Sequence, residues 1–398
     1  MEPKDTPKYK YARYGRVLWA ALLCALLTLA VTYPAEAAFA RDAPAAPARA
    51  WILVDAESGE RLAGENATRE LPMASTTKIM TALVVFEEDV DLDEEVTVSA
   101  EAAEYARPPF SNIGLRQGDR LTVRELLTAA MLESGNDAAY ALAEHVGGGS
   151  VERFVEMMNR RAEKLGLEET SFDNPVGFDD PDHHSSARDL ARMAREARSY
   201  DELRQIVDTP SALIDTAGGR EIPLQTTNEL LASYPAANGV KTGTTSAAGE
   251  SLVASAARGD ESYITVLLDA DDRFGSAAEE LEYGFSNYDR RQAIRAGQSY
   301  ASEPLPHRPE ERVRLVAGES AESLVPAGSD LERRVEIVDE LPRSAEKGER
   351  LGRVIAFDPE EGGERVAQAP LVAAEGYEEA SVWQRLWYTA GGIFRDRG

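Results

Sequence analysis

The sequence predicts an α+β fold, with helices and antiparallel strands in separate stretches of the chain. A buried strand pattern at Trp51–Asp55 comes first, and helical patterns then dominate from Ser75 to about Arg198. From about Gly218 the pattern changes to β-branched runs separated by turn residues. After about residue 291 the runs become short and alternating, which predicts a second, small all-β domain.

The first 40 residues are expected to be a secretory signal peptide. A basic head (residues 4–16) precedes the apolar run Val17–Val31, and small residues follow with an A-x-A pattern at Ala35–Ala37. An uncleaved membrane anchor is the alternative, which the shortness of the apolar run disfavours. Cys24 lies inside the apolar run, so the exported protein is expected to contain no cysteine.

Composition excludes several kinds of site. The formal net charge is −27, and removing residues 1–40 changes it to −29, so a nucleic-acid partner is not expected. One cysteine cannot form a disulfide, zinc or iron–sulfur framework. Four histidines are too few to indicate a histidine-based metal site, and the adjacent His183 and His184 are expected to be exposed loop residues. We therefore expect neither a metal nor a cofactor.

Helix ends are marked by capping residues. Thr122 and Glu125 have the spacing of a capping box, which predicts the start of a helix that continues to about residue 132. A second helix is expected from Asn136, and a third ends at Gly166, a typical C-terminal cap. Ser186, three residues before an aspartate, predicts the start of a fourth helix.

The strands after Gly218 are expected to form antiparallel hairpins. The runs "GVKTGTT", "ESLVASAAR" and "SYITVLLDA" are close together, and Asn238–Gly239, Ala248–Gly249 and Gly259–Asp260 are predicted turns. A helix follows at "AAEELEYGF". The simplest closure is a sheet assembled from the first strand and these late strands, with the helices packed on it.

The C-terminal stretch is aromatic and separate in character. On a helix, Trp383, Leu386, Trp387 and Ala390 share a face that Ile393 and Phe394 extend. This face is too short to span a bilayer, and it predicts an amphipathic helix on a membrane surface. A helix docked on the β domain is the alternative. The predicted divisions are a signal peptide (1–40), a linker (41–49), a main domain (50–290), an all-β domain (291–373) and this tail (374–398).

A lysine interrupts the otherwise apolar helix that begins near Ser75. Ser75 and Lys78 are three residues apart, so a hydroxyl and an amine share a helix face. A desolvated lysine has a lowered pKa and can activate a serine as a nucleophile. Alone, the S-x-x-K pattern is weak, because it occurs by chance in most long proteins.

Two further motifs follow in a fixed order. Ser134–Gly135–Asn136 lies between two predicted helices, where the alternative is a plain helix break with Asn136 as N-cap. Lys241–Thr242–Gly243 lies on a predicted strand, where the alternative is an ordinary strand with a glycine. S-x-x-K, S-x-N and K-T-G in this order, on these elements, are typical of the active-site serine penicillin-recognising enzymes.

The wider sequence resembles the serine-type D-alanyl-D-alanine carboxypeptidases, the low-molecular-mass penicillin-binding proteins. The resemblance covers most of residues 50–290 and is carried by "LPMASTTKIMTAL", "LLTAAMLESGNDAAYALAEHV", "MNRRAEKLGLEETSFDNPVGFDD", "SSARDLARMA", "GVKTGTT" and "DRFGSAAEELEYGF". It implies a β-lactamase/DD-peptidase-like domain followed by the small all-β domain and the amphipathic helix.

The resemblance also implies residue roles. Ser75 would attack the D-Ala–D-Ala carbonyl, and Lys78 would take its proton. Ser134 and Lys241 would relay the proton to the departing D-alanine, and Asn136 would orient Lys78 and the substrate amide. The motif residues of the predicted strand are expected to bind the substrate.

The substrate-binding set implied by the resemblance is Thr242, Gly243, Thr244 and Arg273. The two threonines would help hold the terminal carboxylate, and Arg273 would lie near it. A surface salt bridge is the alternative for Arg273. The backbone N–H groups of Ser75 and Thr244 would form the oxyanion hole.

The expected protein is an exported hydrolase on the outer face of the cytoplasmic membrane, with peptidoglycan stem peptides as substrate and β-lactams as inhibitors. A β-lactamase shares the three motifs, but no E-x-x-L-N pattern lies between Ser134 and Lys241. A DD-endopeptidase that cuts cross-links is the closer alternative. A non-enzymatic wall-binding protein is disfavoured because each expected reacting side chain is present.

Overall fold

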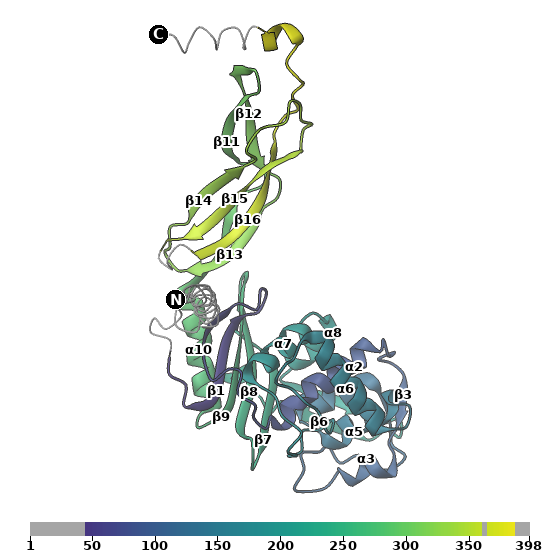
Figure 1. Ribbon diagram of the computed structural model, residues 1–398. Coiled ribbons are helices and arrows are strands. Elements are labelled where there is room, and N and C mark those ends of the chain that lie inside the picture. The colour runs from purple at the N-terminus through teal and green to yellow at the C-terminus, as the bar shows by residue number, and fades with distance from the viewer. Residues whose placement is uncertain (1–43, 360–363, 387–398) are drawn as a thin grey trace, which may run out of the picture. The chain divides into compact units, whose positions relative to one another are not determined.

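A five-stranded antiparallel sheet organises the first part of the computed structural model, which describes residues 44–359 and 364–386 (Figure 1). Its strand order is β2-β1-β9-β8-β7. The bounds are β1 (Ala48–Asp55), β2 (Arg61–Glu65), β7 (Ala237–Thr245), β8 (Gly249–Arg258) and β9 (Glu261–Ala270). In the pairing of β1 with β9, Trp51 lies opposite Leu267, so the sheet is built from both ends of the segment, as predicted. Strand β1 includes the last two residues of the predicted linker.

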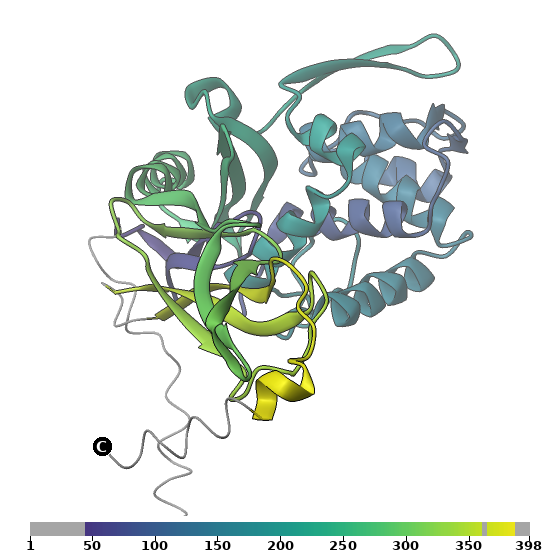
Figure 2. The same ribbon diagram turned by 90° about the horizontal axis from the view of Figure 1, so that it is seen from above.

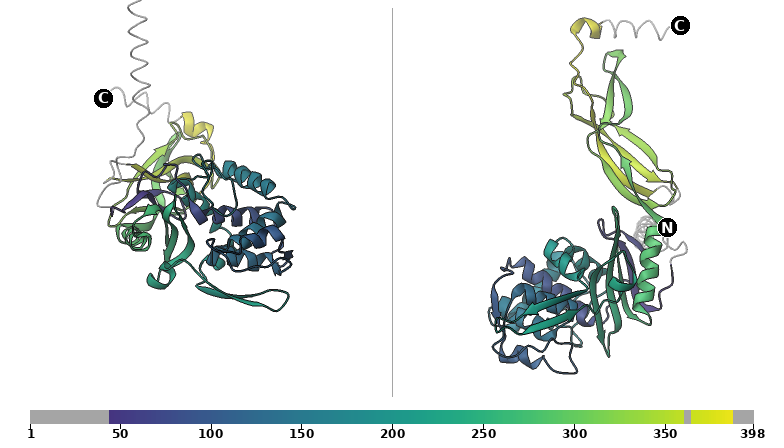
Figure 3. Two further views of the ribbon diagram at one scale, coloured as in Figure 1. Left: turned by 90° about the horizontal axis from the view of Figure 1, so that it is seen from below. Right: turned by 180° about the vertical axis from the view of Figure 1, so that it is seen from behind.

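Helices cover both faces of this sheet. Helix α10 (Arg273–Asn287) lies on one face, where Leu230 of α9 (Leu230–Ser233) belongs to the same hydrophobic core. The remaining helices gather on the other side (Figures 2 and 3). They are η1 (Ala74–Thr77), α2 (Lys78–Glu87), α3 (Ala100–Glu104), α4 (Val123–Leu132), α5 (Asn136–Val146), α6 (Val151–Leu165), α7 (Ala187–Ala197) and α8 (Asp201–Val207). The predicted caps are confirmed: Thr122 and Glu125 make both bonds of a capping box, Gly166 is left-handed at φ +66°, and Ser186 caps α7.

Alternate side chains of β1 belong to two different hydrophobic cores, one on each face of the sheet. Successive side chains of a strand point to opposite faces. Trp51 and Leu53 therefore pack with Leu281 of α10, whereas Ile52 and Val54 join the core under the other helices. Both faces of the sheet are buried, so its central strands are nearly continuous apolar runs.

One predicted turn and the predicted limits of the strand regions are wrong. Asn238–Gly239 lies inside β7, where the register shifts between Ala237 and Val240, so an irregular strand replaces the predicted turn. Strands also begin before Gly218, because β5 (Ser211–Asp215) and β6 (Glu221–Gln225) form a hairpin. A second small pair, β3 (Glu95–Thr97) and β4 (Arg120–Thr122), interrupts the predicted helical stretch.

The described residues between 288 and 373 form strands and loops only, as predicted. Strand β10 (Tyr288–Ile294) pairs with β13 (Ala321–Pro326). A five-stranded sheet has the order β11-β12-β16-β15-β14. Its bounds are β11 (Ser299–Leu305), β12 (Arg308–Ala317), β14 (Glu332–Ile337), β15 (Arg350–Asp358) and β16 (Glu364–Ala373). These strands have a hydrophobic cluster of their own, which includes Leu315, Val354 and Leu371.

Two predicted segments fall largely outside the described residues. The signal peptide (1–40) lies outside them, and so do residues 387–398 of the tail. In the described part of the tail, residues 382–386 are helical. Within residues 44–359 and 364–386, no helix is long and apolar enough to cross a membrane.

A carboxyl group is buried between α10 and the sheet. Glu280 is inaccessible to solvent, and its Oε2 accepts a hydrogen bond from the hydroxyl of Thr265. Its Oε1 has no hydrogen-bond partner in the described part of the chain. Burial raises the pKa of Glu280 to about 8, because a charged carboxylate loses its hydration there.

Glu280 is predicted to make stability fall as pH rises. Between the ordinary carboxyl pKa and about 8 the folded chain keeps this proton and the unfolded chain releases it, so the free energy of unfolding decreases with pH. Glu280→Gln removes this slope. The variant should gain stability relative to the wild type by up to about 1.4 kcal/mol per pH unit over that range.

Urea denaturation at several pH values measures the effect. Glu163→Gln, at an exposed position of α6, is the matched control and should follow the pH dependence of the wild type. If wild type and Glu280→Gln differ by a constant amount at every pH, Glu280 does not keep its proton in the folded protein.

Candidate active site

The first predicted motif forms a compact turn at the start of α2. Ser75 lies in η1, and Lys78 is the first residue of α2. The hydroxyl of Ser75 caps neither element. Its Oγ instead lies 3.1 Å from Nζ of Lys78, which donates to it. The spacing in the sequence therefore produces the expected hydroxyl–amine pair.

Lys78 is completely buried and fully satisfied. Its Nζ donates to Ser75 Oγ, to Oδ1 of Asn136 at 2.7 Å and to the carbonyl oxygen of Val176 at 2.7 Å. Burial lowers the pKa of Lys78 well below its ordinary value, the positive charge of Lys241 lowers it further, and Asp137 acts in the opposite direction. A neutral amine keeps two N–H donors, enough for Asn136 and Val176, which leaves its lone pair for the Ser75 hydroxyl.

The second motif lies where α4 ends and α5 begins. Ser134 has a left-handed backbone, with φ +61°, and its buried hydroxyl has no hydrogen-bond partner among the described residues. Asn136 is the first residue of α5, and the N-cap is Gly135 without a side-chain cap. The alternative of Asn136 as N-cap is thus excluded, and its amide oxygen is available to Lys78.

Asp137 fixes the loop at 111–115 beside this motif, a role that the sequence did not reveal. Its buried carboxylate accepts hydrogen bonds from the backbone N–H groups of Ile113 and Leu115. The N–H of Asn136 in turn donates to the carbonyl oxygen of Ser111 at 2.8 Å. The loop at 111–115 is therefore fixed directly against α5.

The third motif is on β7, the edge strand of the sheet. Lys241 is buried, and its Nζ donates to the carbonyl oxygen of Thr242 at 3.1 Å. Burial, and then the charge of Arg273, lower the pKa of Lys241 to about 7. Its charge is close enough to Lys78 to lower the pKa of that residue as well.

Two glycines allow the backbone to approach the nucleophile. A Cβ on Gly243 would lie 2.9 Å from the carbonyl oxygen of Met73 and 3.1 Å from the nitrogen of Ser75. A Cβ on Gly177, which has φ +94°, would lie 2.0 Å from the carbonyl oxygen of Ala74. Strand β7 and the loop around Gly177 therefore both press against the turn that carries Ser75.

Arg273 and the two threonines differ in their surroundings. Arg273, the first residue of α10, donates to the carbonyl oxygen of Gly243 at 3.1 Å and to Oγ1 of Thr244 at 2.9 Å. It also lies 3.8 Å from a carboxylate oxygen of Glu250, so the predicted alternative of a salt bridge is present too. The hydroxyl of Thr242 is hydrogen-bonded to that of Thr227 at 2.6 Å. Thr244 is exposed.

The loop at 173–180 supplies the remaining contacts, and sequence reasoning gave its residues no role. Oδ1 of Asn174 accepts the backbone N–H groups of Gly177 and Phe178 at 2.8 and 2.9 Å. This arrangement turns the carbonyl of Val176 toward Lys78. Asp179 accepts from the hydroxyl of Thr245 at 2.6 Å, which ties the loop to the end of β7. An Asn two to four positions before a glycine is a local signal for such a turn.

His183 is buried, which corrects the expectation of an exposed loop residue; His184 is partly exposed. Nδ1 of His183 accepts from the backbone N–H of Asp173 at 3.0 Å, so the ring proton must be on Nε2. Nε2 then donates to the hydroxyl of Thr77 at 2.7 Å. Burial lowers the pKa of His183 to about 4, so the ring is neutral and joins the loop to the Ser75 turn.

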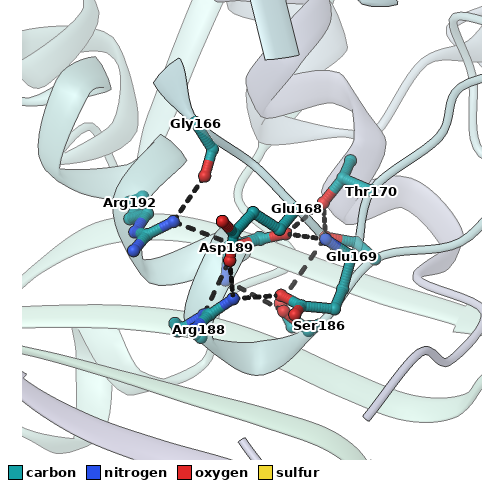
Figure 4. Close-up of polar contacts among 9 residues, drawn as sticks. Gly166, Glu168, Glu169, Thr170, Ser186, Arg188, Asp189 and Arg192 are labelled. Carbon is teal, nitrogen blue, oxygen red and sulfur yellow. Dashed lines mark hydrogen bonds and ion pairs between the residues drawn. The ribbon is translucent and has the colours of Figure 1, made fainter. Parts of the chain in front are cut away.

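An ionic cluster around the buried carboxylate of Asp189 fixes the chain before this loop (Figure 4). Asp189, in the first turn of α7, accepts from the backbone N–H of Glu169 and from the hydroxyl of Thr170 at 2.8 and 2.9 Å. Arg188 lies 2.6 Å from the carboxylate of Glu169, and Arg192 lies 3.6 Å from that of Asp189. The loop thus starts from a rigid point.

The part of the chain that the structure describes contains no group of three or more His, Cys, Asp or Glu side chains that could hold a metal ion. The arrangement offers instead a hydroxyl, a buried amine and a second buried lysine around one turn of backbone. This set can carry out nucleophilic acyl transfer.

Comparison with known proteins identifies relatives of the whole arrangement. The profile of the D-alanyl-D-alanine carboxypeptidase family matches residues 37–272. D-alanyl-D-alanine carboxypeptidase DacC of Escherichia coli is 34% identical over 87% of this chain and 88% of its own length. DacF of Bacillus subtilis is 31% identical over 86% of this chain and 89% of its own length.

A solved structure is also similar. Penicillin-binding protein 5 of Haemophilus influenzae is 29% identical and superposes with a TM-score of 0.69, covering 84% of this chain and 99% of its own. The similarity therefore extends beyond the first sheet and its helices.

Gly243→Ala is predicted to slow reaction at Ser75. The added Cβ would meet the backbone at Met73 and Ser75, and backbone cannot move aside as a flexible side chain can. A displacement of about 1 Å near reacting groups costs up to about 100-fold in rate. Acylation of Ser75 by a fluorescent penicillin, followed by gel, should fall about 10- to 100-fold.

Gly218→Ala is the matched control, because a Cβ there would meet only Thr216 Oγ1, at 3.7 Å. It should acylate like the wild type. Unchanged acylation in Gly243→Ala would mean that the close approach of β7 to the Ser75 turn is not required.

Proposed function

The chain belongs to the D-alanyl-D-alanine carboxypeptidase family, and we propose that it removes the terminal D-alanine of peptidoglycan stem peptides through an acyl-enzyme on Ser75. The observation that carries this proposal is the buried amine of Lys78, 3.1 Å from the Ser75 hydroxyl and held by Asn136 and Val176. The proposed acyl-enzyme chemistry requires no nucleophile other than Ser75.

Acylation begins with proton transfer from Ser75 to Lys78. The lowered pKa of Lys78 provides a neutral amine that can accept the proton as Oγ attacks the carbonyl carbon of the D-Ala–D-Ala bond. The backbone N–H groups of Ser75 and Thr244 are proposed to stabilise the oxyanion. Asn136 and the Val176 carbonyl keep the amine directed at Ser75 while its charge changes.

Cleavage requires a proton on the departing amine of D-alanine. Ser134 supports a relay role because its buried hydroxyl is uncommitted among the described residues. Lys241, with a pKa of about 7, exchanges protons readily near neutral pH. The C–N bond breaks, D-alanine leaves, and water then hydrolyses the ester to restore Ser75.

The terminal carboxylate is proposed to bind at Thr244 and Arg273. The guanidinium lies against β7, and Thr244 presents an exposed hydroxyl beside it. A charge-assisted hydrogen bond to a carboxylate is worth about 1.5–3 kcal/mol. The hydroxyl of Thr242 is hydrogen-bonded to that of Thr227, so we propose that Thr242 acts on the carboxylate together with Thr227. Gly243 keeps β7 close to Ser75.

Two variants should separate chemistry from carboxylate recognition. Lys78→Ala removes the base and should lower both D-alanine release and penicillin acylation about 10²- to 10⁴-fold. Arg273→Ala removes one carboxylate contact and should lower mainly peptide turnover, by about 10- to 100-fold. Intact-mass analysis after penicillin labelling measures the adduct, and Ser75→Ala should show none.

The peptide assay uses a D-Ala–D-Ala pentapeptide beside a cross-linked dimer, so that an endopeptidase is detected directly. Rapid hydrolysis of penicillin over many turnovers would identify a β-lactamase and reject the proposal. If Arg273→Ala turns over the pentapeptide like the wild type, Arg273 does not bind the substrate carboxylate and has only its contacts with Gly243, Thr244 and Glu250.

We propose that the protein is exported and works at the outer face of the cytoplasmic membrane. Residues 1–40 are the proposed signal peptide, 50–290 the catalytic domain, 291–373 the all-β domain and 374–398 a peripheral anchor. The exposure of Val382, Trp383 and Leu386 supports the anchor, since Trp383 has 81% of its surface in solvent. Tryptophan favours the headgroup layer of a bilayer.

Deletion of residues 376–398 should release the protein from membranes and leave turnover of a soluble peptide intact. Binding to anionic vesicles should strengthen with salt, because the formal charge of −29 that remains without residues 1–40 repels such a surface, and salt screens that repulsion. Flotation with vesicles measures the binding. A truncated protein that still floats would show that the tail is not the anchor.

A further inference from the structure

Glu280 is a buried carboxyl group that the acyl-transfer chemistry does not use. It lies on α10, where it is inaccessible to solvent, and its Oε1 has no hydrogen-bond partner in the described part of the chain. Ala277 and Leu281 of the same helix are equally buried against the sheet. An ionisable group in such an apolar contact is costly, because its polar atoms lose water without gaining full hydrogen bonding in return.

The hydrogen bonds of Glu280 depend on its protonation state. The hydroxyl of Thr265 has one proton and two acceptors within reach, Glu280 Oε2 and the carbonyl oxygen of Ile52 at 3.2 Å. A protonated Glu280 can donate to the Thr265 hydroxyl, which then donates to Ile52, so that one chain of hydrogen bonds joins α10, β9 and β1. An ionised Glu280 accepts the hydrogen bond of Thr265 instead, and the link to Ile52 is lost.

In the described part of the chain, the elements packed against α10 supply no charge that could balance an ionised Glu280. The side chains that β1 and β8 contribute to this core are apolar, β9 adds the phenol of Tyr263, and β10 adds that of Tyr288. Burial raises the pKa of Tyr263, so its phenol stays neutral. Arg258, at the end of β8, is paired with Glu282 on the exposed side of α10. An ionised Glu280 is therefore an unpaired charge in an apolar core.

Glu280 changes its charge near pH 8. Burial raises its pKa to about 8, the hydrogen bond with Thr265 acts in the opposite direction, and the charge of the exposed Glu279 raises the pKa further. Below that pH the carboxyl is neutral and the contact between α10 and the sheet is intact. Above it the charged group must gain water, which requires that the helix move away from the sheet.

The same helix positions Arg273. Arg273 is the first residue of α10, and Glu280 is seven residues further on, so the two lie on one face, about 10 Å apart along the helix axis. Arg273 donates to the carbonyl oxygens of Gly243 on β7 and Ser251 on β8, at 3.1 and 3.5 Å. The two turns between them are hydrogen-bonded backbone, so a displacement at Glu280 also moves the guanidinium relative to β7.

We propose that Glu280 is a positioning residue that couples pH to carboxylate binding: its neutral form holds α10 on the sheet with Arg273 against β7, and its ionised form withdraws Arg273 from the substrate carboxylate. The inference rests on the proposed function, in which Arg273 and Thr244 bind that carboxylate. Release of D-alanine then weakens in alkaline surroundings through the binding of the peptide, while the groups that form the acyl-enzyme stay in place.

The pH dependence of KM tests the coupling with the purified protein. D-alanine release from Nα,Nε-diacetyl-L-Lys-D-Ala-D-Ala, which has no titrating amine, is measured for the wild type and for Glu280→Gln, whose amide cannot ionise. The two KM values should agree at about pH 6. At about pH 9 roughly one Glu280 in eleven keeps its proton, so KM of the wild type should be up to about tenfold higher, with similar kcat. Lys241 titrates in both proteins, so the comparison cancels its contribution.

Three further variants make the test specific. Glu279→Gln removes the charge that raises the pKa of Glu280, so the rise in KM should begin at lower pH, in a variant that changes only an exposed residue. In the Arg273→Ala background, Glu280→Gln should no longer change KM at any pH, because Glu280 acts through Arg273. Glu163→Gln, at an exposed position of α6, should follow the wild type.

Failure of the function and failure of the coupling give different results. No D-alanine at any pH and no penicillin adduct on Ser75 would reject the proposed function itself. A constant ratio of the two KM values across the pH range, with turnover intact, would reject only the coupling. A fall in the kcat of the wild type without a rise in KM would show that ionised Glu280 unfolds the protein instead of moving Arg273, which likewise overturns the coupling.

Discussion

The amine of Lys78 is completely buried, and the structure around it follows from that constraint. A buried lysine either loses its charge or must be surrounded by acceptors. Here three acceptors converge on Nζ from three separate elements: the Ser75 turn, the start of α5 and the loop at 173–180. The packing of the helices against the sheet must therefore bring all three elements within hydrogen-bonding distance of this one nitrogen.

The supporting contacts are arranged in layers outward from Lys78. Asp137 holds the loop beside Asn136, Asn174 turns the Val176 carbonyl inward, and neutral His183 joins the same loop to Thr77. Farther out, the ionic cluster around the buried carboxylate of Asp189 fixes the beginning of the loop. These groups touch no reacting atom. They hold the carbonyl and amide that keep the amine directed at Ser75.

Electrostatics gives this site its selectivity within an acidic protein. Lys78, Lys241 and Arg273 lie along one side of the Ser75 turn in a chain with a formal charge of −27. The charge of Lys241 lowers the pKa of Lys78, and the charge of Arg273 lowers the pKa of Lys241, so full protonation of the two lysines is disfavoured without a bound anion. A free peptide carboxylate is the ligand we propose for this site, because its negative charge would relieve this repulsion.

The sequence by itself determined the elements and the reacting residues. Local signals were sufficient for the capping box at Thr122, the left-handed cap at Gly166 and the pairing of Ser75 with Lys78, because each depends on residues three or four positions apart. The order of the three motifs, with the family resemblance, predicted Asn136, Lys241 and the α+β fold. The strand pattern was misread at Asn238–Gly239, since a bulge and a turn have the same local composition.

Only the tertiary structure decided which groups surround those residues. The Val176 carbonyl is 98 positions from Lys78 in the chain, and a backbone carbonyl has no signature in the sequence. The burial of His183 depends on its contact with Thr77, 106 positions away. Likewise, the rings of Tyr140, Tyr105, Phe178 and Phe110 contact one another in a row because two loops meet beside α5. Contacts between distant segments depend on the packing of the whole domain, which no local pattern specifies.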